Sequence, residues 1–228
     1  MSMSEMMTTG QQILPFYLVC DESYSMSGAP LDSMNDSMLE LHKEIGSNPV
    51  VSDKTRFAIV GFSDDAEVLL ELSDLSMVTS LPVLAPRGGT SFAAAFRLLR
   101  DTIEKDVRDL KAQGNVVYRP VVFFLTDGYP TDEWTAEYAE LTDGSNPVHP
   151  KILAFGIGDA DDNVISKVAT FRAFKADGTM SAASALREFA VALTKSIVKS
   201  GSTASSEGMT LQTPDEIPGF TALSVDAV

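Results

Sequence analysis

The 228-residue chain is short of cysteine, of basic residues and of long apolar runs. Its single cysteine, Cys20, excludes an internal disulfide, which fits a reducing compartment. Lysine and arginine together number 17 against 32 aspartates and glutamates, so the formal net charge is −15. Because nucleic acids and anionic membrane surfaces are bound through clustered positive charge, this balance argues against both as partners.

The sequence also shows no pattern typical of a targeting or membrane-spanning segment. No apolar stretch approaches the roughly 20 residues that a membrane-spanning helix needs. Residues 1–12 lack the basic region and apolar core of a secretory signal peptide, and we expect them to form a flexible N-terminus. These absences predict a cytoplasmic protein, and the 44% hydrophobic content is enough for one substantial core.

Strand-like and helix-like segments alternate between residues 13 and 199, which we expect to form one domain. Apolar runs typical of buried strands cover 13–20, 57–62, 67–72, 120–126, 152–157 and 171–174. Apolar residues at helical spacing cover 31–45, 91–112, 135–141, 162–169 and 183–198. The pattern predicts an α/β fold with a mostly parallel sheet covered by helices on both faces. A short connection between the second and third strands predicts a hairpin, and hence one antiparallel edge strand.

Residues 200–228 differ in composition from the rest of the chain. They contain acidic but no basic residues and are rich in Ser, Thr, Gly and Pro, so we expect an acidic flexible tail. Within it, Asp215 and Glu216 are candidates to offer a carboxylate to a metal site, although plain disorder is the simpler interpretation.

The end of the first strand carries the most informative motif. There the apolar run gives way to Asp21, Ser23 and Ser25 at alternate positions. A carboxylate and two hydroxyls are hard oxygen ligands, suited to Mg²⁺, Mn²⁺ or Ca²⁺. Asp and Ser also cap helices, so the motif by itself leaves capping and metal binding equally open.

Two further polar segments belong to the same edge of the predicted sheet. Thr90 follows Arg87-Gly88-Gly89 and precedes the longest helix, and Asp127 comes directly after the strand 120–126. In open α/β sheets, ligands bind beyond the carboxyl ends of the strands. We therefore expect Asp21, Thr90 and Asp127 to lie close together.

The three motifs, taken in this order, resemble the von Willebrand factor A domain, over roughly residues 13–199. The resemblance implies a Rossmann-like fold of three layers, αβα, with a metal-ion-dependent adhesion site. In such a site Ser23 and Ser25 would bind the metal through their hydroxyls, and Thr90 directly or through water. The resemblance gives Mg²⁺ as the first candidate, with Mn²⁺ or Ca²⁺ as alternatives.

The same resemblance implies roles for the two carboxylates and for a partner. Asp21 and Asp127 would coordinate the metal directly or through water and orient the serines. Two carboxylates neutralise a divalent cation, and neutral hydroxyls leave it electrophilic. An open coordination position would then attract an Asp or Glu carboxylate of a partner protein.

Several flanking segments look most like the bacterial branch of this family that is associated with tellurite resistance. They are Leu14-Pro15, Met26-Ser27-Gly28, Arg119-Pro120 and Tyr129-Pro130-Thr131-Asp132. The likeness implies a stress-response or signalling assembly with phosphatase, kinase or stress-domain proteins as partners.

Some residues near the motifs invite a second interpretation. Family members often have small residues between these ligands, whereas this chain has Glu22 between Asp21 and Ser23 and Tyr24 between Ser23 and Ser25. We expect Glu22 to be a solvated acid and Tyr24 a surface residue, with partner contact as the alternative for Tyr24. Asp132 is expected at the N-terminus of the helix 135–141, and Trp134 either in the core or in contact with a partner.

The main enzymatic alternative is metal-assisted phosphoryl transfer with Asp21 as phosphate acceptor. A haloacid-dehalogenase-type enzyme needs an acid where Ser23 stands, and a receiver-type site is matched only weakly by Glu22 and Lys151. A serine hydrolase is disfavoured because no Gly-x-Ser-x-Gly occurs and the two histidines have no triad setting. We therefore expect a non-enzymatic, metal-dependent interaction module.

Overall fold

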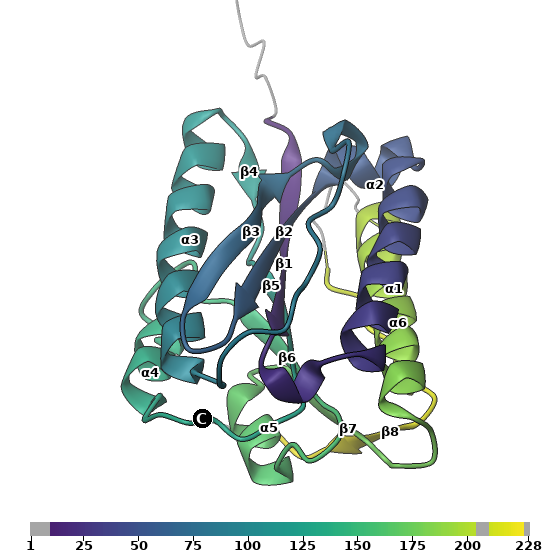
Figure 1. Cartoon of the computed structure of the whole chain (residues 1–228). Helices are drawn as coiled ribbons and strands as arrows, with labels where there is room; N and C mark the ends of the chain where they lie inside the picture. The colour runs from purple at the N-terminus through teal and green to yellow at the C-terminus, as the bar shows by residue number, and fades with distance from the viewer. Residues whose placement is uncertain (1–9, 204–209, 226–228) are drawn as a thin grey trace, which may run out of the picture.

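The computed structural model describes residues 10–203 and 210–225 and has the predicted α/β fold (Figure 1). The flexible N-terminus that we expect over residues 1–12 falls mostly on residues 1–9, which lie outside the described residues. The strands are β1 (Gln12–Asp21), β2 (Thr55–Phe62), β3 (Ala66–Ser73), β4 (Val116–Val117), β5 (Val121–Thr126), β6 (Lys151–Gly156), β7 (Arg172–Ala176) and β8 (Phe220–Leu223). The α-helices are α1 (Ala29–Gly46), α2 (Pro49–Lys54), α3 (Phe92–Ala112), α4 (Thr135–Thr142), α5 (Asp162–Val168) and α6 (Ala182–Ser202).

The sheet has the order β3-β2-β1-β5-β6-β7-β8, with the short β4 pairing with β1. Strands β2, β1, β5, β6 and β7 are parallel. The hairpin strand β3 is antiparallel at one edge, as expected from the sequence. A second antiparallel strand, β8, forms the other edge.

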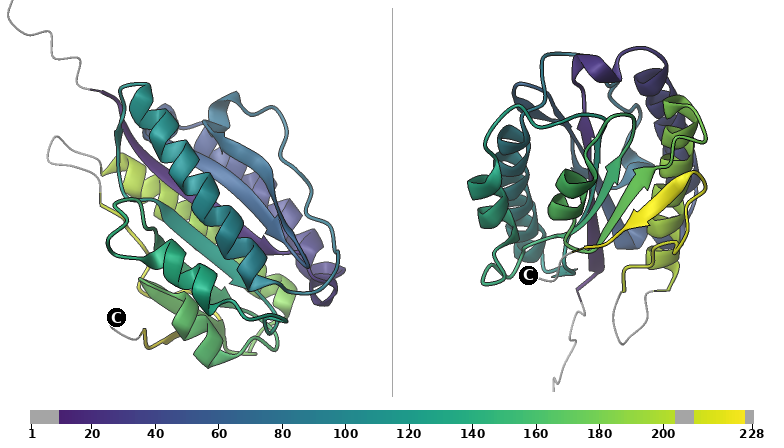
Figure 2. Two further views of the ribbon diagram at one scale, coloured as in Figure 1. Left: turned by 90° about the vertical axis from the view of Figure 1, so that its left-hand side faces the viewer. Right: turned by 90° about the horizontal axis from the view of Figure 1, so that it is seen from below.

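Helices cover both faces of the sheet, as Figure 2 shows: α1, α2 and α6 lie on one face and α3, α4 and α5 on the other. Successive residues of β1 therefore enter different cores. Phe16 and Leu18 pack toward α1 and α6, whereas Tyr17 and Val19 pack toward α3. Burial on both sides explains why the central strands are continuously apolar. Cys20 is fully buried in β1, which raises the pKa of its thiol.

The expectation of a flexible tail from residue 200 is wrong for residues 210–225. Helix α6 continues to Ser202, and Leu211 and Ile217 are buried in the core beneath it. Phe220 lies edge-on to Phe155 at 5.9 Å and begins β8, which closes the edge of β7. In residues 210–225 the few apolar side chains are spaced irregularly among Ser, Thr and Pro, so no periodicity in the sequence predicted this strand.

None of the helices in the described ranges is long and apolar enough to cross a membrane.

Candidate metal centre

The candidate site lies where β1 and β5 end. These strands are neighbours, with Cys20 opposite Leu125, so Asp21, the last residue of β1, and Asp127, directly after β5, lie at adjacent strand ends. The loop before α3 reaches the same edge, because Thr131 donates from its backbone N–H to the carbonyl of Thr90 at 2.9 Å. The expected meeting of the three motifs is therefore present.

Asp21 is completely buried and holds the centre of the site together. Its Oδ1 accepts from the backbone N–H of Ser23 at 2.8 Å, and its Oδ2 accepts from Thr126 Oγ1 at 2.5 Å. Burial raises the pKa of this carboxyl to about 6, although the hydrogen bonds oppose the shift. The carboxylate thus fixes the start of the loop that carries both serines.

A row of oxygen atoms runs outward from this buried end. Ser23 Oγ lies 2.9 Å from Ser25 Oγ, and Ser25 Oγ donates to Asp127 Oδ1 at 2.7 Å. Ser23 is 2% exposed, whereas Ser25 lies at the surface. Partial burial also raises the pKa of Asp127. The row presents hydroxyl and carboxylate oxygens to solvent at its outer end.

Thr90 approaches this row from the side. A methyl group placed on Gly128 would lie 3.7 Å from Thr90 Oγ1 and 3.9 Å from Ser25 Oγ. Both hydroxyls therefore border the same small space beside Gly128. The structure brings together all five residues that the sequence singled out: Asp21, Ser23, Ser25, Thr90 and Asp127.

The oxygen set fits a small hard cation. Neighbouring ligands of an octahedral ion with bonds of 2.0–2.1 Å lie about 3 Å apart, close to the 2.9 Å and 2.7 Å separations in the row. Over residues 10–203 and 210–225, no group of three or more His, Cys, Asp or Glu side chains could hold a metal ion. A cation here would depend on the hydroxyls as much as on the carboxylates.

Glu22 is not the solvated acid that we expect from the sequence, since it is 2% exposed. Its Oε1 accepts from the backbone N–H of Ala85 at 3.0 Å, and its Oε2 lies 3.1 Å from the guanidinium of Arg87. Gly61 makes room for it, because a Cβ there would lie 2.0 Å from Oε2. Arg87 is 65 residues away in the sequence, so no local pattern indicated that Glu22 would be buried with a cation as its partner.

The loop before α3 is held by two more carboxylates. Asp64, in the connection between β2 and β3, accepts from the backbone N–H of Gly89 at 2.9 Å. Asp132, expected to serve α4, instead caps α3, accepting from Ser91 Oγ at 2.5 Å and from Phe92 N at 3.2 Å. Both contacts fix the loop on either side of Thr90.

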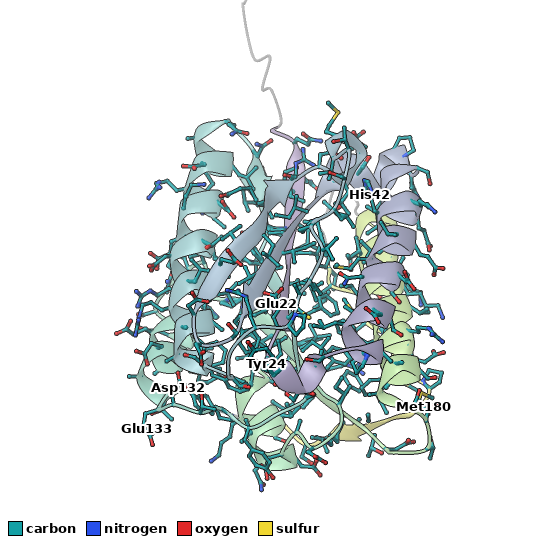
Figure 3. The ribbon with its side chains drawn as sticks, in the orientation of Figure 1. Glu22, Tyr24, His42, Asp132, Glu133 and Met180 are labelled. Atoms are coloured by element: carbon teal, nitrogen blue, oxygen red, sulfur yellow. The ribbon has the colours of Figure 1, made fainter. Side chains whose placement is uncertain are left out.

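Trp134 is buried in the core, whereas Tyr24 is exposed at the surface. Trp134 is 8% exposed and packs against Phe92 at 5.9 Å and Phe96 at 5.7 Å between ring centres, so it belongs to the core. Tyr24 is 68% exposed beside the end of β1 (Figure 3). Tyr129, directly after Gly128, is 58% exposed. Two exposed tyrosines therefore border the site.

Neither histidine belongs to the site. His42 lies toward the opposite end of the sheet, where its Nε2 bonds to the carbonyl of Leu75 at 3.0 Å (Figure 3). His149 bonds through Nδ1 to the carbonyl of Asn146 at 2.5 Å. Each histidine ring thus bonds to a backbone carbonyl.

Comparison with known proteins places this architecture in a known family. The family model of the von Willebrand factor type A domain matches residues 16–191. No curated protein sequence matches the chain.

Several solved structures share the fold. Proximal thread matrix protein 1 from the mussel byssus, with a zinc-occupied MIDAS motif, is 16% identical with a TM-score of 0.56, covering 83% of this chain and 48% of that one. The pilus adhesin SpaC from Lactobacillus rhamnosus GG, in an open conformation, is 16% identical with a TM-score of 0.63, covering 82% and 30%. The ArnB paralog VWA2 from Sulfolobus acidocaldarius is 17% identical with a TM-score of 0.56, covering 82% and 46%. The chain thus spans less than half of each of these proteins, and at such identities the likeness concerns the fold.

Proposed function

The chain belongs to the von Willebrand factor type A domain family, and from that premise we propose that its strand-end site binds a divalent cation, Mg²⁺ in the first place, and through it a carboxylate of a partner protein. Domains of this family generally mediate protein interactions, often through a metal ion. Residues Asp21, Ser23, Ser25, Thr90 and Asp127 are the proposed ligands or ligand-orienting groups.

The observation that carries the proposal is the convergence of Ser25, Thr90 and Asp127 from three separate segments. Two carboxylates balance the charge of one divalent cation, and neutral hydroxyls leave it able to attract a further carboxylate. The outer end of the oxygen row is open to solvent, since Ser25 is exposed. A partner's Asp or Glu is the simplest anionic group of the right size for that position.

The zinc-occupied MIDAS of the mussel byssus protein supports the choice of a divalent cation. The sequence resemblance to the tellurite-resistance branch extends the proposal to a bacterial stress-response or signalling assembly. In that setting the domain would act in the cytoplasm, with phosphatase, kinase or stress-domain proteins as partners.

Phosphoryl transfer through Asp21 has less support from the geometry. The carboxyl is fully buried, and each of its oxygens already accepts a hydrogen bond. Lys175, near the end of β7, donates from Nζ to the carbonyls of Gly158 and Ala160 at 2.7 Å. Asp21 is therefore not exposed for attack on a phosphorus atom, and Lys175 is engaged by backbone carbonyls.

The direct test measures Mn²⁺ binding by electron paramagnetic resonance. Titration calorimetry then measures how well Mg²⁺ competes with Mn²⁺ for the site. Ser23→Ala and Thr90→Ala should lose binding, whereas Ser27→Ala, whose exposed hydroxyl donates to the carbonyl of Tyr24, should keep it. Equal Mn²⁺ binding by all three variants would refute the site. Turnover of a phosphate ester that disappears in Asp21→Ala would replace the interaction module with an enzyme.

A further inference from the structure

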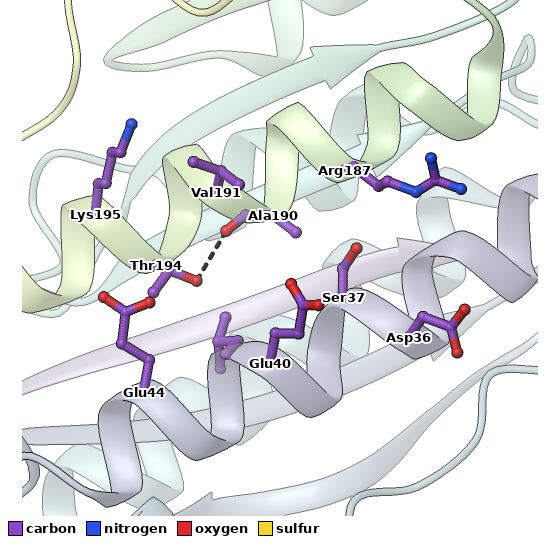
Figure 4. Close-up of a pocket in the computed structure, with 10 residues that line it drawn as sticks. Asp36, Ser37, Glu40, Glu44, Arg187, Ala190, Val191, Thr194 and Lys195 are labelled. Carbon is purple, nitrogen blue, oxygen red and sulfur yellow. Dashed lines mark hydrogen bonds between the residues drawn. The ribbon is translucent and has the colours of Figure 1, made fainter.

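Helices α1 and α6 lie side by side on one face of the sheet and leave a groove of about 410 Å³ between them (Figure 4). Its floor is formed by the buried residues Ser37, Leu41, Ala190 and Thr194. The two hydroxyls are satisfied within their own helices, Ser37 by the carbonyl of Ser33 and Thr194 by that of Ala190. The side-chain hydroxyls of the floor therefore already have hydrogen-bond partners and do not need a polar ligand.

The walls of the groove carry opposite charges. The α1 wall bears Asp36, Glu40 and Glu44, which recur every four residues. The α6 wall bears Arg187 and Lys195, eight residues apart, with the exposed Val191 between them. Eight residues of helix rise about 12 Å, so both charged rows have the same length.

These five charged side chains are exposed, and within the part of the chain that the structure describes none of them takes part in an ion pair or a side-chain hydrogen bond. Elsewhere on the surface, arginines such as Arg97 and Arg100 pair with nearby acids. The groove thus presents one acidic and one basic row, both available to a partner.

The two rows are in register. Helices α1 and α6 run in the same direction, and Figure 4 shows Asp36 and Arg187 toward one end of the groove and Glu44 and Lys195 toward the other. A two-fold axis that is parallel to the helices and lies in the plane of the face would place α1 of one copy over α6 of the other, with acids opposite bases at both ends. An axis perpendicular to the helices would instead place α1 on α1, acid against acid.

We propose that this face is a dimer interface, in which the α1–α6 groove pairs with the same groove of a second copy about the axis parallel to the helices. Such an interface is self-complementary, as a two-fold contact requires. Val191 of each copy lies over α1 of the other at the centre of the contact, and the ion pairs at the two ends fix the register. The net charge of −15 opposes association, but beyond about 8 Å that repulsion is screened at physiological salt, whereas contacting pairs are screened much less.

Charge exchange provides the test. Asp36→Lys/Glu44→Lys places bases opposite bases at both ends of the contact, and Arg187→Glu/Lys195→Glu places acids opposite acids, so each variant should be monomeric. A mixture of the two restores opposite charges at both halves of the contact and should form a heterodimer. Asp101→Lys/Glu104→Lys on α3, where both acids are exposed, is the matched control and should dimerise like the unchanged chain.

Sedimentation velocity between about 1 and 200 µM covers the range of weak to moderate dimers. Circular dichroism confirms that each variant is folded. The proposal would be overturned if the unchanged chain stayed monomeric over this whole range. It would also be overturned if both variants lost the dimer and their mixture did not recover it, even if the groove bound some other molecule. Dimerisation should persist in EDTA, which separates this proposal from the metal site.

Discussion

The carboxylate of Glu22 lies 3.1 Å from the guanidinium of Arg87, and this pair joins the loop after β1 to the loop before α3. Two backbone bonds run beside it, from Arg87 N to the carbonyl of Glu22 at 2.6 Å and from Tyr24 N to the carbonyl of Gly88 at 3.2 Å. The side chain of Glu22 is 3% exposed and that of Arg87 29%. The pair therefore sets the distance between the serine motif and Thr90.

Arg87→Ala should lower the free energy of unfolding by about 3 kcal/mol, because it leaves the buried Glu22 carboxylate without its cation. Arg108→Ala is the matched control, since among the described residues Arg108 pairs only with the half-exposed Asp109 at 3.5 Å, and its loss should change stability by less than about 0.5 kcal/mol. Urea denaturation measures both. Equal losses of unfolding free energy in the two variants would show that the Glu22–Arg87 pair stabilises the fold no more than an exposed ion pair does.

Gly128→Ala should weaken Mn²⁺ binding by on the order of tenfold while leaving the fold stable. The added methyl would sit at ordinary contact distance from Thr90 Oγ1 and Ser25 Oγ, and so would fill the space that both hydroxyls border. Gly144→Ala, in an exposed loop with no atom within 4 Å of the new Cβ, is the control. Unchanged Mn²⁺ affinity in Gly128→Ala would place the ion elsewhere.

Asp132→Ala should cost about 1–2 kcal/mol of stability, because it removes the acceptor for Ser91 Oγ and for the N–H groups of Phe92 and Ala93 at the start of α3. Glu133→Ala, an exposed neighbour, should cost less than about 0.5 kcal/mol. Thermal unfolding compares the two. A loss of helix α4 with α3 intact would return Asp132 to the role that we expect from the sequence.

The metal-free protein should become less stable as the pH rises from about 4 to 7. The pKa of Asp21 is about 6 in the folded state against 3.8 as its ordinary value, so the folded state holds this proton more tightly. The resulting stability is present below pH 3.8, is lost as the pH passes 6, and amounts to about 3 kcal/mol at most. Urea denaturation in EDTA should show this decline, and Asp21→Asn should flatten it. Identical pH dependence in the two proteins would assign the effect to other groups.

Ile217→Ala should destabilise the domain by about 2–4 kcal/mol, because Ile217 is 4% exposed and packs in the core beneath α6. The adjacent Glu216 is exposed, and Glu216→Ala serves as the control. Asp215, which we consider as a metal ligand at the sequence level, pairs instead with Arg172 at 2.8 Å, at the start of β7. If Ile217→Ala had a negligible effect on stability, the expectation of a flexible tail would stand.

The local order of elements could be predicted from the sequence because it depends on local periodicity. The apolar run before Asp21 had to be a buried strand, and the apolar stripe from Phe92 to Val107 had to be a helix. The hairpin between β2 and β3 followed from a short polar connection. The short α2 and β8 have too few residues for a period to appear, and both were missed.

The sequence by itself determined which oxygen-bearing side chains stand near the strand ends, because Asp21 and Asp127 come at the ends of clearly patterned strands and Thr90 comes just before a clearly patterned helix. Only the tertiary structure decided how they are held. Glu22 and Arg87 are 65 residues apart and Asp132 caps a helix that begins 40 residues earlier. Such pairings depend on which surfaces meet after folding, and local periodicity carries no record of them. The charged groove between α1 and α6 has the same origin, since its two walls are neighbours only in space.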